Sequence, residues 1–116
     1  MNHKELDVWK KGMDLVEMIY SISDSFPDSE RFGLTSQIRR AAVSIPSNIA
    51  EGAARKGDKE LVYFVNVALG SLSEVETQYL IAIRLGFIKE EIVVSNLIND
   101  EKQLLLGFRN YIKRKT

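Results

Sequence analysis

The sequence predicts an all-α fold, an antiparallel up-down-up-down four-helix bundle that occupies residues 1–116 as a single domain. The 116 residues, 45% of them hydrophobic, suffice for a core without a metal or disulfide. Apolar residues recur at helical spacing, with no sustained alternation typical of strands. Breaks at Pro27, Gly52 to Gly57 and Gly86 divide the chain, and short connections favour antiparallel neighbours. The predicted helices cover roughly residues 5–25, 34–53, 58–85 and 89–114.

The first predicted helix has more apolar residues than one bundle seam requires. One stripe consists of Trp9, Met13, Val16 and Tyr20, and a second of Val8, Leu15, Ile19, Ile22 and Phe26. At about 100° per residue the two stripes cover about half of the helix circumference. Two interpretations remain open. Either one stripe faces a partner chain, with Trp9 and Phe26 as oligomer-interface residues, or the helix lies deep in the core of the monomer.

The second predicted helix has an apolar face and a separate polar stripe. The apolar face consists of Leu34, Ile38, Ala42, Ile45 and Ile49, and the polar stripe includes Gln37, Arg40, Ser44, Asn48 and Glu51. We expect the stripe to be buried and to serve either subunit packing or an ion pair with Glu76 in the core, rather than to bind a ligand. Thr35 or Ser36 is the expected N-cap. Pro46 lacks a backbone donor and crowds the preceding turn, so we expect a kink there.

The third predicted helix is the longest and carries few charges. Its apolar stripe consists of Leu61, Val65, Ala68, Leu72, Val75, Tyr79 and Ile83. Glu76 falls inside the apolar arc, where a carboxylate requires a cationic partner. Arg39 or Arg40 of the second helix is the expected partner. Asp58 is the expected N-cap, and Gly86 suits the residue that follows the helix.

The fourth predicted helix contributes a further apolar face and a basic end. The residues expected in the core are Val93, Leu97, Leu104, Leu105, Phe108, Tyr111 and Ile112. The basic end, Lys113 to Lys115, complements the helix dipole, and we interpret it as a solvated tail.

The residue types argue against catalysis and against a metal or cofactor site. The chain has no cysteine, and its one histidine, His3, lies in a segment expected to fray. The sequence lacks the inward-facing Glu-x-x-His pairs of di-iron bundles, the phosphate-binding glycine loops and the histidine of a serine triad. No apolar run reaches the roughly 18 residues of a membrane span. The charged N-terminus is unlike a signal peptide, so we expect a cytoplasmic protein without a membrane partner.

The formal net charge is zero, but the charges are unevenly distributed. Residues 1–30 sum to −4 and residues 31–59 to +4. Within the basic segment, Arg55, Lys56 and Lys59 cluster where one helix ends and the next begins, and such a patch suits phosphates. The alternative is a solvated loop that pairs with the acidic first segment of another subunit.

Three stretches carry a resemblance to a known family. They are the segment Phe32 to Gly52 (FGLTSQIRRAAVSIPSNIAEG), the segment Leu6 to Lys10 (LDVWK) and the segment Ala68 to Gln78 (ALGSLSEVETQ). Together they closely resemble the bacterial four-helix-bundle proteins encoded in 23S rRNA intervening sequences, and the similarity covers nearly the whole chain. The family is related to the accessory variability protein of diversity-generating retroelements, a basic pentamer that associates with nucleic acid and a reverse transcriptase.

The resemblance implies a left-handed bundle that assembles into a homopentamer, and it carries no catalytic residue over to this chain. We therefore expect a non-enzymatic assembly or adaptor protein. RNA or a nucleic-acid-processing protein is the expected partner, and Arg55, Lys56 and Lys59 are the candidate contacts to nucleic acid. The alternative is a structural protein–protein interaction module without nucleic-acid affinity. The residues expected to support the buried polar contacts and assembly are Gln37, Arg39, Arg40, Ser44, Asn48, Glu51 and Glu76.

Overall fold

The computed structural model describes residues 1–115, and it confirms the all-α prediction over that range. The four long helices are α1 (Asp7–Ser23), α2 (Leu34–Ala53), α3 (Asp58–Arg84) and α4 (Ile92–Lys115). Two short 3-10 helices, η1 (His3–Glu5) and η2 (Asp28–Glu30), precede α1 and α2. The predicted boundaries of the long helices agree with these to within three residues.

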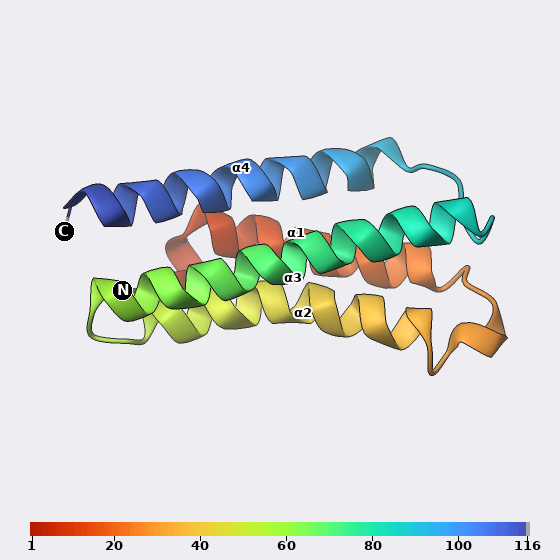
Figure 1. The fold of residues 1–116 in the computed structure, drawn as a ribbon, viewed down its shortest axis with the longest axis horizontal. Coiled ribbons are helices and arrows are strands. Elements are labelled where there is room, and N and C mark those ends of the chain that lie inside the picture. The colour runs from red at the N-terminus through yellow and green to blue at the C-terminus, as the bar shows by residue number, and fades with distance from the viewer. Residues whose placement is uncertain (116) are drawn as a thin grey trace.

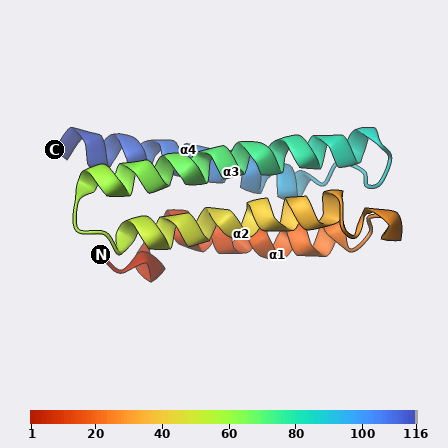
Figure 2. The ribbon, with the colours of Figure 1, turned by 60° about the horizontal axis from the view of Figure 1, so that its bottom comes forward.

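Successive helices run in opposite directions, so the bundle is antiparallel (Figure 1). α1 and α3 each pack against both α2 and α4, which makes α1–α3 and α2–α4 the two diagonals of the bundle. Figure 2 shows α1 beside α2 and α3 beside α4 in two layers. The molecule measures 46 × 25 × 20 Å. α2 runs as one helix through Pro46. The kink there and the left-handed twist stay predictions.

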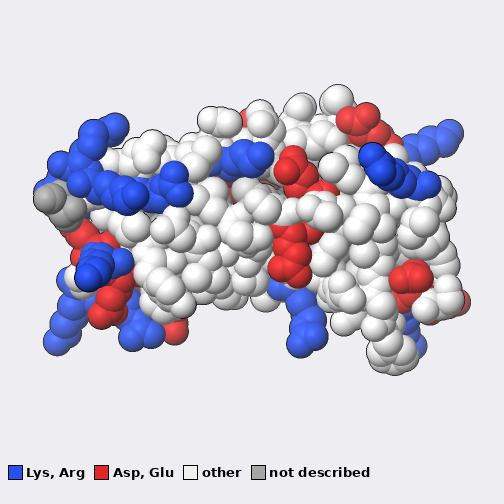
Figure 3. Space-filling model, in the orientation of Figure 1, with Lys and Arg blue, Asp and Glu red and all other residues white. Residues whose placement is uncertain are grey.

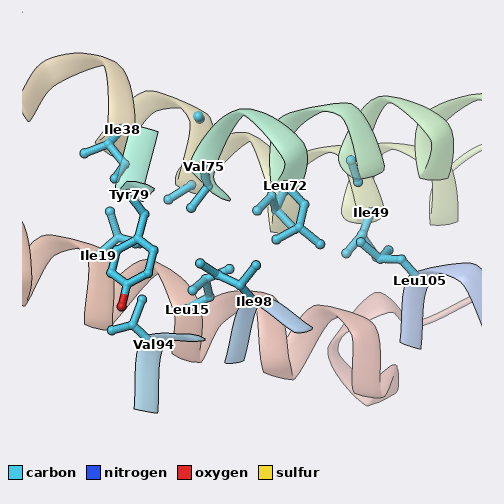
Figure 4. Close-up of a cluster of buried hydrophobic side chains, with 14 of the residues drawn as sticks. Leu15, Ile19, Ile38, Ile49, Leu72, Val75, Tyr79, Val94, Ile98 and Leu105 are labelled. Atoms are coloured by element: carbon cyan, nitrogen blue, oxygen red, sulfur yellow. The ribbon is translucent and has the colours of Figure 1, made fainter. Parts of the chain in front are cut away.

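All four helices contribute side chains to one apolar core (Figure 4). Its fully buried members include Leu15 and Ile19 from α1, Ile38 and Ile49 from α2, and Val65 from α3. The apolar faces predicted for α1, α2 and α3 supply most of this core, because their spacing of three and four residues keeps them on one side of each helix.

α2 and α3 pack together more extensively than the other helix pairs of the bundle. Gly52, near the end of α2, allows this approach: a Cβ atom there would lie 2.9 Å from the Cβ of Phe64 on α3. Farther along the seam, the hydroxyls of Ser44 and Ser71 are 2.8 Å apart. Small side chains therefore let the two backbones approach and supply a hydrogen bond between them.

The helix ends differ from the prediction at two places. Gly33, rather than Thr35 or Ser36, is the N-cap of α2, and the Glu30 carboxylate accepts from the Leu34 backbone N–H at 3.0 Å. Gly57 is likewise the N-cap of α3, and Asp58 is its first helical residue. In both cases the helix begins before the predicted cap: Thr35 and Ser36 lie two and three residues after Gly33, and Asp58 lies one residue after Gly57.

The connection between α3 and α4 is fixed at two points. Gly86 adopts a φ of 77°, which confirms the prediction that a glycine ends α3 there. The buried hydroxyl of Tyr79 accepts from the Glu91 backbone N–H at 2.8 Å and lies 3.1 Å from both the Glu91 carbonyl oxygen and the Ser95 hydroxyl. Tyr79 thus anchors the beginning of α4 to the body of α3.

The core face of α4 differs from the predicted one. Val93 and Tyr111, expected in the core, are 53% and 54% exposed. The buried residues of α4 are Val94, Ile98, Glu101, Leu105 and Ile112. Their spacing of four, three, four and seven is a heptad pattern in which a glutamate occupies a core position. The prediction missed this register because it assigned only apolar residues to the core face, and Glu101 was not among them.

We predict that Gly52→Ala lowers the free energy of unfolding by about 1–3 kcal/mol, because the new methyl group would overlap Phe64. Gly107→Ala on α4 is the matched control, since a Cβ atom there has nothing within 4 Å. This control should raise stability by about 0.5–1 kcal/mol through helix propensity. Urea unfolding followed by circular dichroism measures both, and equal effects would contradict the proposed close packing.

Candidate interaction surfaces

The polar stripe predicted on α2 lies in two environments. Ser44 and Asn48 are half-buried at the α3 seam, where the Asn48 side-chain amide donates to the Ser44 carbonyl oxygen at 2.7 Å and to the Ser44 hydroxyl at 2.9 Å. Together with Ser71 they form a polar cluster within one chain. The other members of the stripe are exposed: Gln37, Arg40 and Glu51. Their role in assembly stays a prediction.

Glu76 does not pair with Arg39 or Arg40. Its Oε1 lies 3.8 Å from the Nζ of Lys102 on α4, and the two side chains are 43% and 40% exposed. Glu76 faces the edge of the α3–α4 seam, where water solvates the carboxylate and no buried partner is required. Such an exposed pair contributes about 0–1 kcal/mol.

Arg39 instead fastens the end of α1 to α2. Its Nε donates to the Ser23 hydroxyl at 2.8 Å, and its Nη2 donates to Asp24 Oδ1 at 2.9 Å and to the Tyr20 carbonyl oxygen at 3.3 Å. The guanidinium also lies over the Tyr20 ring, 4.6 Å from its centre. These contacts commit Arg39 to its own chain, and α1 ends at the residues that it binds.

The two aromatic residues assigned to an oligomer interface are not equally accessible. Phe26 is 5% exposed and packs against Phe87, with 5.9 Å between the ring centres. The structure therefore places Phe26 in the core of the single chain, where its ring offers little surface to a second copy. Trp9 is half-buried at the other end of α1, against the edge of His3. An interface role for Trp9 stays a prediction.

The outer face of α3 combines exposure with few charges. Tyr63, Leu80 and Ile81 are 62%, 51% and 40% exposed. Between them the exposed residues include Asn66, Gly70, Ser73, Glu74 and Thr77. Figure 3 shows the side of the molecule on which α3 lies as mostly uncharged, interrupted by a small acidic group. At its far end a groove of about 440 Å³ is lined by Thr77, Leu80, Ile81, Ile83 and Arg84.

The antiparallel fold brings two basic groups together at one end of the bundle. The α2–α3 connection, with Arg55, Lys56 and Lys59, lies beside the end of α4, and Lys115 Nζ is 3.8 Å from Asp58 Oδ2. Figure 3 shows lysine and arginine side chains gathered at this end. Sequence reasoning treated the α4 end as a separate solvated tail, because only the fold shows that it meets the α2–α3 connection.

Within this basic end the three predicted contacts differ. Arg55 pairs with Glu51 at 3.2 Å and with Glu60 at 3.9 Å, and it lies over the Phe64 ring. Its charge is largely compensated inside the chain. Lys56 lies in the α2–α3 connection and Lys59 in the first turn of α3, and both are exposed. They are the better placed of the three to meet an external anion.

Sequence reasoning missed one ionisable residue, Glu101 of α4. It is 0% exposed, and neither carboxylate oxygen has a hydrogen-bond partner. Burial raises the pKa of the Glu101 carboxyl to about 8, against the opposing attraction of Lys11. The heptad spacing of Val94, Ile98, Leu105 and Ile112 around it was the signal that would have placed it in the core.

Across residues 1–115, no three histidine, cysteine or acidic side chains gather closely enough to hold a metal ion. In the same range, none of the helices has the length and apolar character that crossing a membrane requires.

The motifs that suggested a family lie within the match to a family model. The model described as 23S rRNA-intervening sequence protein matches residues 4–105. The chain belongs to this family. The match extends over η1, α1, α2 and α3 and into α4 as far as Leu105, so it includes the α2–α3 seam and Glu101. It confirms the resemblance drawn from the three sequence motifs. No curated protein matches this 23S rRNA-intervening sequence protein.

We predict that Arg39→Ala lowers the free energy of unfolding by about 1–2 kcal/mol, because it removes a charge-assisted pair and a cation–π contact. Arg40→Ala is the matched control on the exposed side of the same helix and should change stability by less than about 0.5 kcal/mol. Thermal and urea unfolding measure both. If the Arg40 variant loses as much stability as the Arg39 variant, the assignment of Arg39 as the α1–α2 fastener is incorrect.

Proposed function

We propose that this 23S rRNA-intervening sequence protein is a non-catalytic cytoplasmic assembly protein that forms a homo-oligomer, a pentamer by family resemblance, and associates with RNA. The observation that carries the proposal is the outer face of α3, which exposes Tyr63, Leu80 and Ile81 along a helix with few charges. An exposed face that carries large apolar side chains and few charges is typical of a surface that another chain covers.

The position of this face suits contact between copies. α3 is the longest helix, and its outer side lies away from the α2 and α4 seams that hold the single chain together. Exposed Gly70 and Ser73 in the middle of the face permit close approach of a second backbone. Figure 3 shows lysine and arginine side chains gathered at one end of the bundle and an acidic group near the middle of this side, where Glu74 is exposed. A second copy would therefore desolvate few charges on this face, chiefly the Glu74 carboxylate.

The RNA part of the proposal depends on the basic end. Lys56 and Lys59 supply exposed cations there, and the adjoining end of α4 supplies further basic residues. A neutral protomer has too few such contacts for strong binding to phosphates. A cyclic oligomer repeats the basic end in each copy and concentrates these charges, so assembly and RNA association support each other.

The non-catalytic part of the proposal is supported by what the chain offers as chemical groups. His3, the one histidine, packs against Trp9 beside the beginning of α1. The most perturbed acid, Glu101, is enclosed in the core and has no access to a substrate.

We predict that Leu80→Glu combined with Ile81→Glu converts the protein to a monomer, because the two carboxylates would be desolvated in the interface. The matched control combines Ile92→Glu with Val93→Glu at the beginning of α4, where the side chains are as exposed, at 67% and 53%. This control should keep the oligomer. Light scattering coupled to size-exclusion chromatography gives the mass of each. A monomeric wild-type protein at micromolar concentration would overturn the assembly proposal.

We predict that RNA binding weakens at least tenfold when Lys56→Glu and Lys59→Glu are combined, and that wild-type binding falls steeply with salt. The control combines Arg31→Glu with Lys89→Glu at the opposite end of the bundle, with the same change in charge. Fluorescence anisotropy with labelled single-stranded and hairpin RNA at low salt measures both. An oligomer that binds neither RNA would support the alternative, a protein–protein interaction module.

A further inference from the structure

The core of the bundle contains a carboxyl group for which the fold has made room. Glu101 extends from α4 toward α1, where Gly12 is buried and carries no side chain. A Cβ atom at residue 12 would lie 2.9 Å from Glu101 Oε2. The glycine therefore provides the space that the carboxyl occupies. Despite this accommodation, neither carboxyl oxygen receives a hydrogen bond, and the residue is 0% exposed.

The groups that surround Glu101 do not compensate a negative charge in the core, so the carboxyl is most simply neutralised by a proton. From α1 the facing charge is Lys11, next to Gly12 in the sequence, and its attraction does not outweigh the burial. From α2 the residues beside Gly12 are Ile45 and Pro46, both apolar. On α3 the acid toward α4 is Glu76, and it is paired with Lys102 at the surface. On α4 itself, Ile98 and Leu105 flank Glu101 on the core face.

We propose that Glu101 is a proton-binding site that couples the docking of α4 on α1 to pH. With a proton the neutral carboxyl stays in the core beside Gly12. Without it the carboxylate moves toward water and Lys11, and α4 separates locally from α1. This inference concerns the single chain and does not depend on the oligomer or on RNA.

The α1–α4 seam is the side of the bundle that can open. The α2–α3 seam is closed by the Gly52 contact and the hydrogen bond between Ser44 and Ser71. Between the start of α1 and α4, by contrast, lies an open groove of about 420 Å³. Its lining includes Leu6, Val8, Leu104, Gly107 and Phe108, so it begins one turn beyond Glu101. The groove is open to solvent, so water reaches the seam about one helical turn from Glu101.

The direction of the pH effect follows from the two protonation equilibria. Folding raises the pKa of Glu101 from 4.5 to about 8, so between these values the folded chain holds a proton that the unfolded chain releases. The contribution of this group to stability is therefore fully present below pH 4.5. It falls as the pH rises, and the unfolding equilibrium constant increases by up to about tenfold per pH unit until pH 8 is passed.

The test compares wild-type protein with Glu101→Gln, a neutral residue of the same shape. Urea unfolding at pH 6, 7, 8 and 9, at one protein concentration, should show the wild-type protein losing stability with pH and the variant largely insensitive. Asp100→Asn, a neighbouring exposed acid, is the matched control and should keep the wild-type pH dependence. Identical pH dependence in the wild-type and Glu101→Gln proteins would overturn the proposal.

Two measurements keep the proposal testable if Glu101→Gln does not fold. In the wild-type protein, carbon NMR of the glutamate carboxyls should show one residue, Glu101, titrating near pH 8, whereas titration near 4.5 would overturn the assignment. Hydrogen exchange should accelerate in α1 and α4 between pH 7 and 9, beyond the intrinsic dependence of the amides, with α2 and α3 less affected. Uniform acceleration in all four helices would also contradict local opening of the α1–α4 seam.

Discussion

The close approach of α2 and α3 is the constraint on which the bundle depends. Gly52 and the Ser44–Ser71 pair let two long helices pack backbone to backbone, and the apolar faces of α1 and α4 then close over them. This seam is built from small and polar residues of α2. Part of the polar stripe predicted on α2 is therefore half-buried in the seam. Ser44 and Asn48 face α3 in the same chain, and they leave Arg40 and Glu51 on the surface.

The fold was predictable from the sequence because helix period and chain breaks are local signals. The core faces of α1 to α3, the glycine at the end of α3 and the four-helix order all follow from them. The partners of the charged side chains were harder to predict, because they depend on which helices become neighbours in the fold. Glu76 looked buried on a helical wheel, but it lies at the α3–α4 edge beside Lys102. Glu101 was not predicted to lie in the core, but the heptad of α4 turns it inward.

The distribution of charge shows the same difference between chain order and space. Along the chain an acidic first segment precedes a basic second one, which suggested pairing between subunits. In the fold Asp24 binds Arg39, and Arg55 binds Glu51 and Glu60, so part of this charge is neutralised inside one chain. The fold also brings the α2–α3 connection beside the end of α4. A protein with zero net charge thus acquires a basic end.

Glu101 and Gly12 are best understood as one feature, because each is unfavourable alone. A glycine inside α1 weakens the helix, and a carboxyl in an apolar core loses its hydration. An apolar residue at position 101 would pack at lower cost, but it would also fit other registers of α4 against α1. The carboxyl fits where Gly12 leaves room, so we expect it to disfavour registers of α4 that place a side chain opposite it. The same pairing that specifies the position of α4 makes that position sensitive to a proton.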